Sequence, residues 1–165
     1  QVPWVDAASV SAGLQQGDTW VIDLGTAAQF IRGHIPGAWG LMRSTLVDDL
    51  RLVLSTSGAV ATRWVLTCAD GVASPYALAD LQQACADLGL HAQVSVLRGG
   101  NAAWLQSGRA LQAGATGWLA QRIDRYRRPY EGTANAQAAM QAYLDWEFGL
   151  VEQLRRDGTH HFKVI

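Results

Sequence analysis

Short apolar runs alternate with amphipathic helical segments to about residue 110, and this alternation limits the fold more than any other feature of the sequence. Runs of this length, rich in Val, Ile, Leu and Trp, are typical of buried strands. Strands separated by helices form parallel sheets that are covered on both faces. We therefore expect an α/β fold with strands at Thr19–Asp23, 38–39, Arg63–Thr67 and Gln93–Leu97.

Helical segments are predicted from apolar spacing and from residues that start or stop helices. The clearest is 75–88, with Ser74 as the expected N-cap, Pro75 at the first helical position and Gly89 at the end. Its apolar face consists of Leu78, Leu81, Cys85 and Leu88. Shorter helices are expected at 6–15, 26–32, 46–54 and after the glycines at 99–100.

The C-terminal part of the chain is different in kind. Glycines and a proline make 113–132 an irregular connector, and 133–157 has the apolar period of one long helix. We assign 1–112 to one domain, and 113–165 to a connector and long helix that packs on the domain or extends it. The apolar side of this helix is wide enough that we expect another surface to cover it.

The composition excludes several classes of function. The 165 residues carry a formal net charge of −1 and are 49% hydrophobic, so we expect a compact core and neither nucleic acid nor a membrane as partner. No apolar run has the length of a membrane span. A basic stretch is interpreted as a solvated surface rather than an RNA-binding patch; it contains Arg122, Arg125, Tyr126, Arg127, Arg128 and Tyr130.

Two cysteines, Cys68 and Cys85, are too few for a disulfide framework in a chain of this length. We expect them to be reduced thiols of a cytoplasmic protein. Neither has the spacing of zinc ligands, and we expect no metal and no cofactor. Because the first residue is Gln1 rather than Met, we expect a longer protein whose other domains are among the partners.

Cys68 is the candidate catalytic residue. It lies between a predicted strand and a predicted helix, where unpaired backbone N–H groups and the helix dipole favour negative charge. These groups favour the thiolate, which is the nucleophilic form of cysteine. A glycine in the loop allows its amides to turn toward a bound anion. The expected cradle is the backbone of Ala69, Asp70, Gly71, Val72, Ala73 and Ser74.

Three stretches, in this order, resemble the signatures of the rhodanese homology domain, a sulfurtransferase family. They are 21–24 with 30–38, 65–68 with the loop that follows, and 96–104 with the Ser-Gly pair at 107–108. The resemblance covers about 2–111 and implies a five-stranded parallel sheet core with helices on both faces. The C-terminal extension is similar to segments of multi-domain bacterial members.

In that family the cysteine takes a sulfane sulfur from a donor as a persulfide and passes it to an acceptor. The resemblance therefore implies a sulfurtransferase with Cys68 as nucleophile, whose partners are a small sulfur donor or protein persulfide and a thiol acceptor. The loop 68–73 has six residues, as is typical of sulfurtransferases, whereas related phosphatases carry one more. A tyrosine phosphatase also needs Arg six positions after the cysteine, where this chain has Ser74.

Two loop positions differ from well-known thiosulfate-using members, which carry cations just after the cysteine. This chain has Ala69 and Asp70 there, and a carboxylate beside a dianion is unfavourable. We therefore expect weak activity with thiosulfate, or a persulfide donor, with Arg43 as a candidate anion contact. The alternative is a catalytically weak or idle module that acts as a docking or regulatory domain.

Other residues are assigned structural roles. We expect Cys85 and Trp104 in the core, His34 to fix its loop by hydrogen bonds, and Asp23 to bond loop amides. The structural interpretation of Cys68 itself is a small buried residue at the end of a strand.

Overall fold

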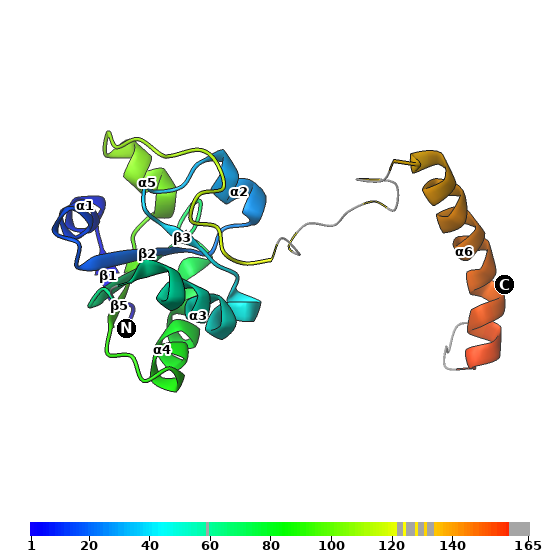
Figure 1. The fold of residues 1–165 in the computed structure, drawn as a ribbon, viewed down its shortest axis with the longest axis horizontal. Coiled ribbons are helices and arrows are strands. Elements are labelled where there is room, and N and C mark those ends of the chain that lie inside the picture. Colours follow the sequence, from blue (N-terminus) through cyan, green and yellow to red (C-terminus); the bar gives the residue numbers. More distant parts are fainter. Residues whose placement is uncertain (59, 122–123, 125–127, 129–130, 132–133, 159–165) are drawn as a thin grey trace. The chain divides into compact units, whose positions relative to one another are not determined.

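The computed structural model describes residues 1–58, 60–121, 124, 128, 131 and 134–158 (Figure 1). The chain divides into two compact units, Gln1–Arg125 and Tyr126–Ile165. The first unit contains the sheet and the candidate site, and the second contains one described helix. Within the predicted basic stretch, only Arg128 belongs to the described residues; the other five lie outside them.

Five parallel strands form one sheet in the order β1-β5-β4-β2-β3. The longest pairing places the five residues of β2 opposite the five residues of β4. This confirms the expected five-stranded parallel core. The strands are β1 (Trp4–Val5), β2 (Thr19–Asp23), β3 (Trp39–Gly40), β4 (Arg63–Thr67) and β5 (Gln93–Leu97).

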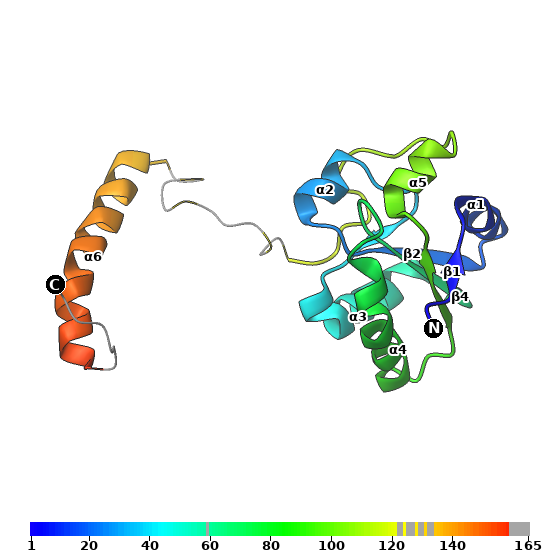
Figure 2. The same ribbon diagram turned by 180° about the vertical axis from the view of Figure 1, so that it is seen from behind.

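Helices cover both faces of the sheet, as expected (Figures 1 and 2). One face carries α1 (Ala7–Gln16), α2 (Ala27–Arg32) and α5 (Gly100–Gln106). The other face carries α3 and α4, each preceded by a short 3-10 helix. These four elements are η1 (Arg43–Thr45), α3 (Leu46–Ser57), η2 (Ser74–Ala77) and α4 (Leu78–Asp87).

Side chains of the central strands alternate between two cores, because neighbouring residues of a strand point to opposite faces. Val21 and Val65 pack with α1, α2 and α5. Ile22, Leu66 and the large ring of Trp64 pack with α3 and α4. All five side chains are buried, so the sheet has no solvated face, as is typical of parallel sheets.

Strand β1 was not predicted from the sequence. It has only two residues, too few to show an alternating pattern. Its place is set by pairing with β5, in which the Arg98 N–H donates to the Val5 carbonyl and the Val96 N–H donates to the Pro3 carbonyl, both at 2.9 Å. These hydrogen bonds join the N-terminal residues of the chain to β5.

The prediction of Ser74 as a helix N-cap was wrong. The 3-10 helix η2 begins at Ser74 itself, with Ala73 before it, and no side chain caps its amides. Ser74 is instead buried, and its hydroxyl faces Cys68. The regular helix α4 starts at Leu78, three residues after Pro75.

After α5 the chain returns to the β3 edge of the sheet. Gln112 pairs with His34, and Trp118 pairs with Gly40. The Trp118 ring also meets the Phe30 ring, with centroids 5.4 Å apart. The first unit therefore includes part of the predicted connector. Packing or extension of the domain by the rest of 113–165 stays a prediction.

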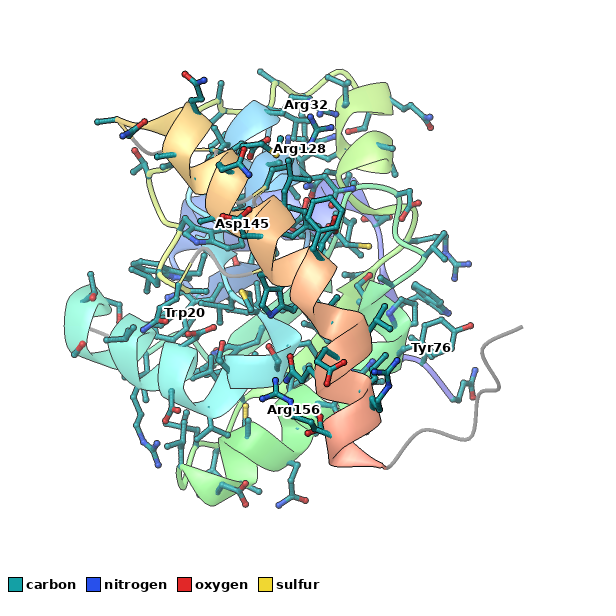
Figure 3. All side chains as sticks on the ribbon, turned by 90° about the vertical axis from the view of Figure 1, so that its right-hand side faces the viewer. Trp20, Arg32, Tyr76, Arg128, Asp145 and Arg156 are labelled. Atoms are coloured by element: carbon teal, nitrogen blue, oxygen red, sulfur yellow. The ribbon has the colours of Figure 1, made fainter. Side chains whose placement is uncertain are left out.

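The second unit contains α6 (Ala136–Asp157). The helix begins after Asn135, whose side chain accepts a hydrogen bond from the Ala138 N–H, and it ends at Gly158 in the left-handed conformation. No residue of α6 is buried. Figure 3 draws its side chains and labels Asp145 and Arg156 among them. No helix in the described part of the chain is long and apolar enough to cross a membrane.

Candidate active site

The carboxyl ends of β2 and β4 lie side by side, and the candidate site is built on them. Asp23 pairs in register with Thr67, and the Leu24 N–H donates to the Thr67 carbonyl at 2.9 Å. Cys68 is the next residue, so strand pairing fixes its place at this edge of the sheet. In open parallel α/β sheets this is the edge at which ligands bind.

The start of α5 holds the loop that follows Cys68. The backbone N–H groups of Asn101 and Ala102 donate to the carbonyls of Cys68 and Ala69 at 2.9 and 3.0 Å. The described peptide bonds are trans, and in a trans peptide the carbonyl and the following N–H point in opposite directions. The amides of Ala69 and Asp70 therefore point away from α5.

Two glycines allow the loop and α5 to lie this close. Gly71 has a φ of +76° and Gly100 a φ of +60°. A Cβ at Gly100 would lie 2.2 Å from the Cys68 carbonyl oxygen, and one at Gly71 would lie 2.6 Å from the Gly100 nitrogen. Only glycine fits at either position. The backbones of the segment 99–101 and of the cysteine loop therefore pack directly against each other.

The Cys68 sulfur lies between two side-chain oxygens. Sγ is 3.7 Å from Asp70 Oδ1 and 3.7 Å from Ser74 Oγ, and the thiol can donate to either oxygen. Cys68 is only 4% exposed and Ser74 is fully buried, whereas Asp70 is exposed. The solvent side of the sulfur is therefore the side on which Asp70 lies.

The Asp70 carboxylate also bonds the loop backbone. Its Oδ1 accepts a hydrogen bond from the Val72 N–H at 3.0 Å. The sequence assigned this amide to the anion cradle, and in this structure the Asp70 carboxylate accepts its hydrogen bond. A cradle role for the backbone of Ala69, Asp70, Gly71, Val72, Ala73 and Ser74 stays a prediction.

A buried hydrogen-bond network joins the ends of β2 and β4 to α5. The Asn101 amide donates to Asp23 Oδ2 at 2.7 Å and accepts from the Thr67 hydroxyl at 2.9 Å. The other oxygen of Asp23 accepts from the Gly25 N–H at 2.8 Å. Burial raises the pKa of Asp23, and the hydrogen bonds from Asn101 and Gly25 offset this in part. Asp23 thus bonds one loop amide, as expected, and one side chain.

Replacing Asn101 by alanine should lower the free energy of unfolding by about 2–4 kcal/mol, because Asp23 and the Thr67 hydroxyl both lose a buried partner. Urea titration measures this loss. Gln83→Ala is the matched control, since Gln83 makes a similar contact with Asp87 at the surface, and we expect a change within about 0.5 kcal/mol. Equal losses in the two variants would contradict the role assigned to Asn101.

Acidification should stabilise the wild-type domain relative to an Asp23→Asn variant. Burial raises the folded-state pKa of Asp23 above its ordinary value of 3.8, so the folded chain binds more protons than the unfolded chain between these two values. The contribution of Asp23 to the free energy of unfolding therefore falls as pH rises through this window, by up to about 1.4 kcal/mol per pH unit.

The readout is the difference in urea-derived free energy between wild type and Asp23→Asn, measured across this pH window. Its slope isolates the titration of Asp23, because a constant change in hydrogen bonding shifts the difference equally at every pH. Asp48→Asn makes the same chemical change at an exposed carboxylate and serves as the control. A wild-type advantage that grows with pH would refute the assignment.

Arg43 pairs with Asp80 at the surface of the first unit. Both residues line a cavity of about 570 Å³, together with Leu24 and Asp124. The cavity adjoins the site, because Leu24 is hydrogen-bonded to the residue before Cys68. The pairing with Asp80 offsets the charge of Arg43, and its proposed contact with a bound anion stays a prediction.

Three other residues have the structural surroundings expected of them. His34 is buried, its ring stacks on Phe30, and its Nδ1 donates to the Phe30 carbonyl at 2.9 Å. Cys85 lies on the buried face of α4, where desolvation raises its pKa to about 11. Trp104 is buried, and its indole N–H donates to the Ala110 carbonyl at 2.9 Å.

The sequence analysis did not assign Thr67 or Asn101 to the site. A signal existed for both: Thr67 is a polar residue at the carboxyl end of buried strand β4, and Asn101 is a polar residue in the first turn of the helix that follows β5. Such positions meet at one edge of the sheet. Their hydrogen-bond partners, however, depend on the strand order.

A model of the rhodanese-like domain family matches residues 6–107, more than half of the chain. The chain belongs to the rhodanese-like domain family. The matched segment includes β2, the cysteine loop and α5, which together form the site described above. This confirms the resemblance inferred from the three signature stretches.

The rhodanese-like chain is 41% identical, over its whole length, to a thiosulfate sulfurtransferase from Pseudomonas aeruginosa, with a TM-score of 0.82. It spans 30% of that protein's length. A search of proteins with curated functions found no match.

Two more distant structures share the fold. A yeast protein described as a tyrosine phosphatase of the rhodanese family has 21% identity and a TM-score of 0.50, over 64% of this chain and 85% of that one. An As-Sb reductase from Leishmania major has 19% identity and a TM-score of 0.55, over 65% of this chain and 79% of that one.

Proposed function

We propose that this domain transfers a sulfane sulfur from a donor to a thiophilic acceptor through a persulfide on Cys68. The position of the Cys68 sulfur carries the proposal: it lies at the carboxyl end of β4, at the head of a six-residue loop that α5 holds in place. The 41% identity with the sulfurtransferase from Pseudomonas aeruginosa supports the same reaction type.

The proposed reaction has two displacement steps. The Cys68 thiolate attacks the outer sulfur of the donor, and the donor remainder leaves with the electron pair of the broken bond; from thiosulfate this group is sulfite. An acceptor thiolate or cyanide then attacks the outer sulfur of the persulfide, and the Cys68 thiolate leaves. Atoms and charge balance in both steps without an external oxidant or reductant.

The two neighbours of the sulfur respond differently when it becomes charged. The Ser74 hydroxyl can turn to donate a hydrogen bond to the thiolate, whereas the ionised Asp70 carboxylate can only repel it. The amides of Ala69 and Asp70, which point away from α5, are the proposed backbone donors to the charged outer sulfur.

Two other functions remain as competitors. A phosphatase needs a cation to stabilise the transferred phosphoryl group, but the position six residues after the cysteine holds the buried Ser74. An idle docking module would explain why Asp70 stands where thiosulfate-using members carry a cation. The idle module predicts no chemistry at Cys68, which makes it directly testable.

The test is the intact mass of the chain after incubation with thiosulfate, mercaptopyruvate or a polysulfide. We expect a gain of one sulfur atom that cyanide removes and that maps to the peptide containing Cys68. No adduct from any donor would refute sulfur transfer and favour the idle module. An adduct that maps to Cys85 would refute the assignment of the nucleophile.

A further inference from the structure

We propose that Asp70 sets the donor specificity of the Cys68 site. It disfavours dianionic donors such as thiosulfate and favours persulfides whose transferable sulfur is carried by an uncharged group. This inference rests on the proposed sulfurtransferase function and adds the class of donor.

Asp70 lies on the path by which a donor reaches the sulfur. Ser74 closes the buried side of Sγ, and the exposed carboxylate of Asp70 lies 3.7 Å away on the solvent side. A donor that places its outer sulfur against Sγ therefore brings its remaining atoms close to Asp70. Two further negative charges at such distances are strongly disfavoured, because the protein screens them less than water does.

Asp70 also occupies part of the binding surface that an anion needs. Its Oδ1 accepts the Val72 N–H at 3.0 Å, so the loop already contains a negatively charged acceptor of its own. An anionic donor that uses this amide must displace the carboxylate. The wild-type loop therefore competes with such a donor through charge and through a hydrogen bond.

Asp70 forms no ion pair within the described residues. Arg43, the candidate anion contact, pairs with Asp80, and no Arg or Lys pairs with Asp70 in that part of the chain. A third carboxylate, Asp124, lines the same cavity as Arg43 and Asp80. Among the described residues that line this cavity, Asp124 therefore adds a negative charge that the Arg43–Asp80 pair does not offset.

A persulfide with an uncharged tail avoids both penalties. The Cys68 thiolate attacks the terminal sulfur of R–S–SH, the S–S bond of the donor breaks, and R–S⁻ leaves with the electron pair. The product is Cys68–S–SH, and the proton stays on the transferred sulfur. The protonated form R–S–SH, which is the form that reacts, brings no negative charge to Asp70, and the leaving thiolate carries its charge away.

The experiment compares the kcat/KM values for thiosulfate and for 2-hydroxyethyl persulfide in four proteins. They are the wild type, Asp70→Asn, Asp70→Ala and the control Asp87→Asn, which removes an exposed carboxylate from α4. The readout is the thiosulfate-to-persulfide ratio, which cancels general effects on the amount of folded protein. A urea titration of each variant accompanies the kinetics.

We expect the ratio to rise about tenfold in Asp70→Asn, which keeps an acceptor for the Val72 amide but removes the charge. It should rise further in Asp70→Ala, which also frees that amide. The wild-type rate with thiosulfate should increase with salt, and Asp70→Asn should lose this dependence. The ratio of Asp87→Asn should equal that of the wild type.

The experiment distinguishes a failure of the specificity proposal for Asp70 from a failure of the proposed sulfur transfer through Cys68. A ratio that is unchanged or lower in Asp70→Asn, with sulfur still added at Cys68, overturns the role of Asp70 and leaves sulfur transfer standing. No adduct from either donor, in any of the four proteins, overturns sulfur transfer and the specificity proposal with it.

Discussion

A Cys68→Ser chain should gain no sulfur from any donor and should transfer sulfur no faster than donor and acceptor do without protein. A serine hydroxyl remains protonated at neutral pH and cannot form the persulfide, so the proposed pathway is removed rather than slowed. The fold should survive, because serine differs from the buried cysteine by one atom and Ser74 and Asp70 lie within bonding reach. Intact mass and a cyanide assay measure the loss.

Cys85→Ser is the matched control, since the chain has only these two cysteines and both are buried. Burial raises the pKa of Cys85 to about 11, so its thiol is protonated at neutral pH and is a poor nucleophile. We expect Cys85→Ser to lose stability in the core yet to form the adduct. If Cys68→Ser kept the adduct and Cys85→Ser lost it, the site would have been placed at the wrong cysteine.

Gly100→Ala should be the most damaging single-methyl substitution near the site. The new Cβ would lie 2.2 Å from the Cys68 carbonyl oxygen and 2.4 Å from the Gly71 nitrogen, and a positive φ of 60° adds strain. Both clashing atoms belong to the backbone, so relief requires the cysteine loop to move. We expect a loss of about 3 kcal/mol or more in the free energy of unfolding, together with slower sulfur transfer.

Gly89→Ala separates the clash from the backbone strain. Gly89 has a similar φ of 67°, but a Cβ there meets nothing within 4 Å. It should cost only about 1 kcal/mol and leave the rate of adduct formation unchanged. Urea titration and timed mass spectra of both variants give the comparison. Similar losses of stability and rate in the two variants would contradict the claim that Gly100 is needed for the close packing of α5 on the cysteine loop.

The layered α/β fold could be predicted because its signals are local. The apolar runs of β2, β4 and β5 and the stop signal at Gly89 are visible in short windows of sequence. Cys68 could be placed at the functional edge for the same reason, since it directly follows a buried strand. Strand β1 could not be found, because two residues carry no period and only the pairing with β5 defines them.

The contacts of the site depend on residues far apart in the sequence. Asn101 reaches Asp23 across 78 positions and Thr67 across 34, and neither contact follows from the pattern around Asn101. The N-cap assignment of Ser74 failed because a local rule competed with burial: its hydroxyl is used by the cysteine, not by the helix. The bond from Val72 to Asp70 spans two residues, yet it depends on the turn that Gly71 permits.

The edges of the sheet have a consequence for behaviour at high concentration. Both edge strands, β1 and β3, are two residues long, and the bridge from Trp118 to Gly40 occupies part of the β3 side. Unpaired strand edges are templates on which other chains can add strands and begin to aggregate. Edge strands of two residues offer little template, so we expect this domain to resist aggregation by strand addition at high concentration.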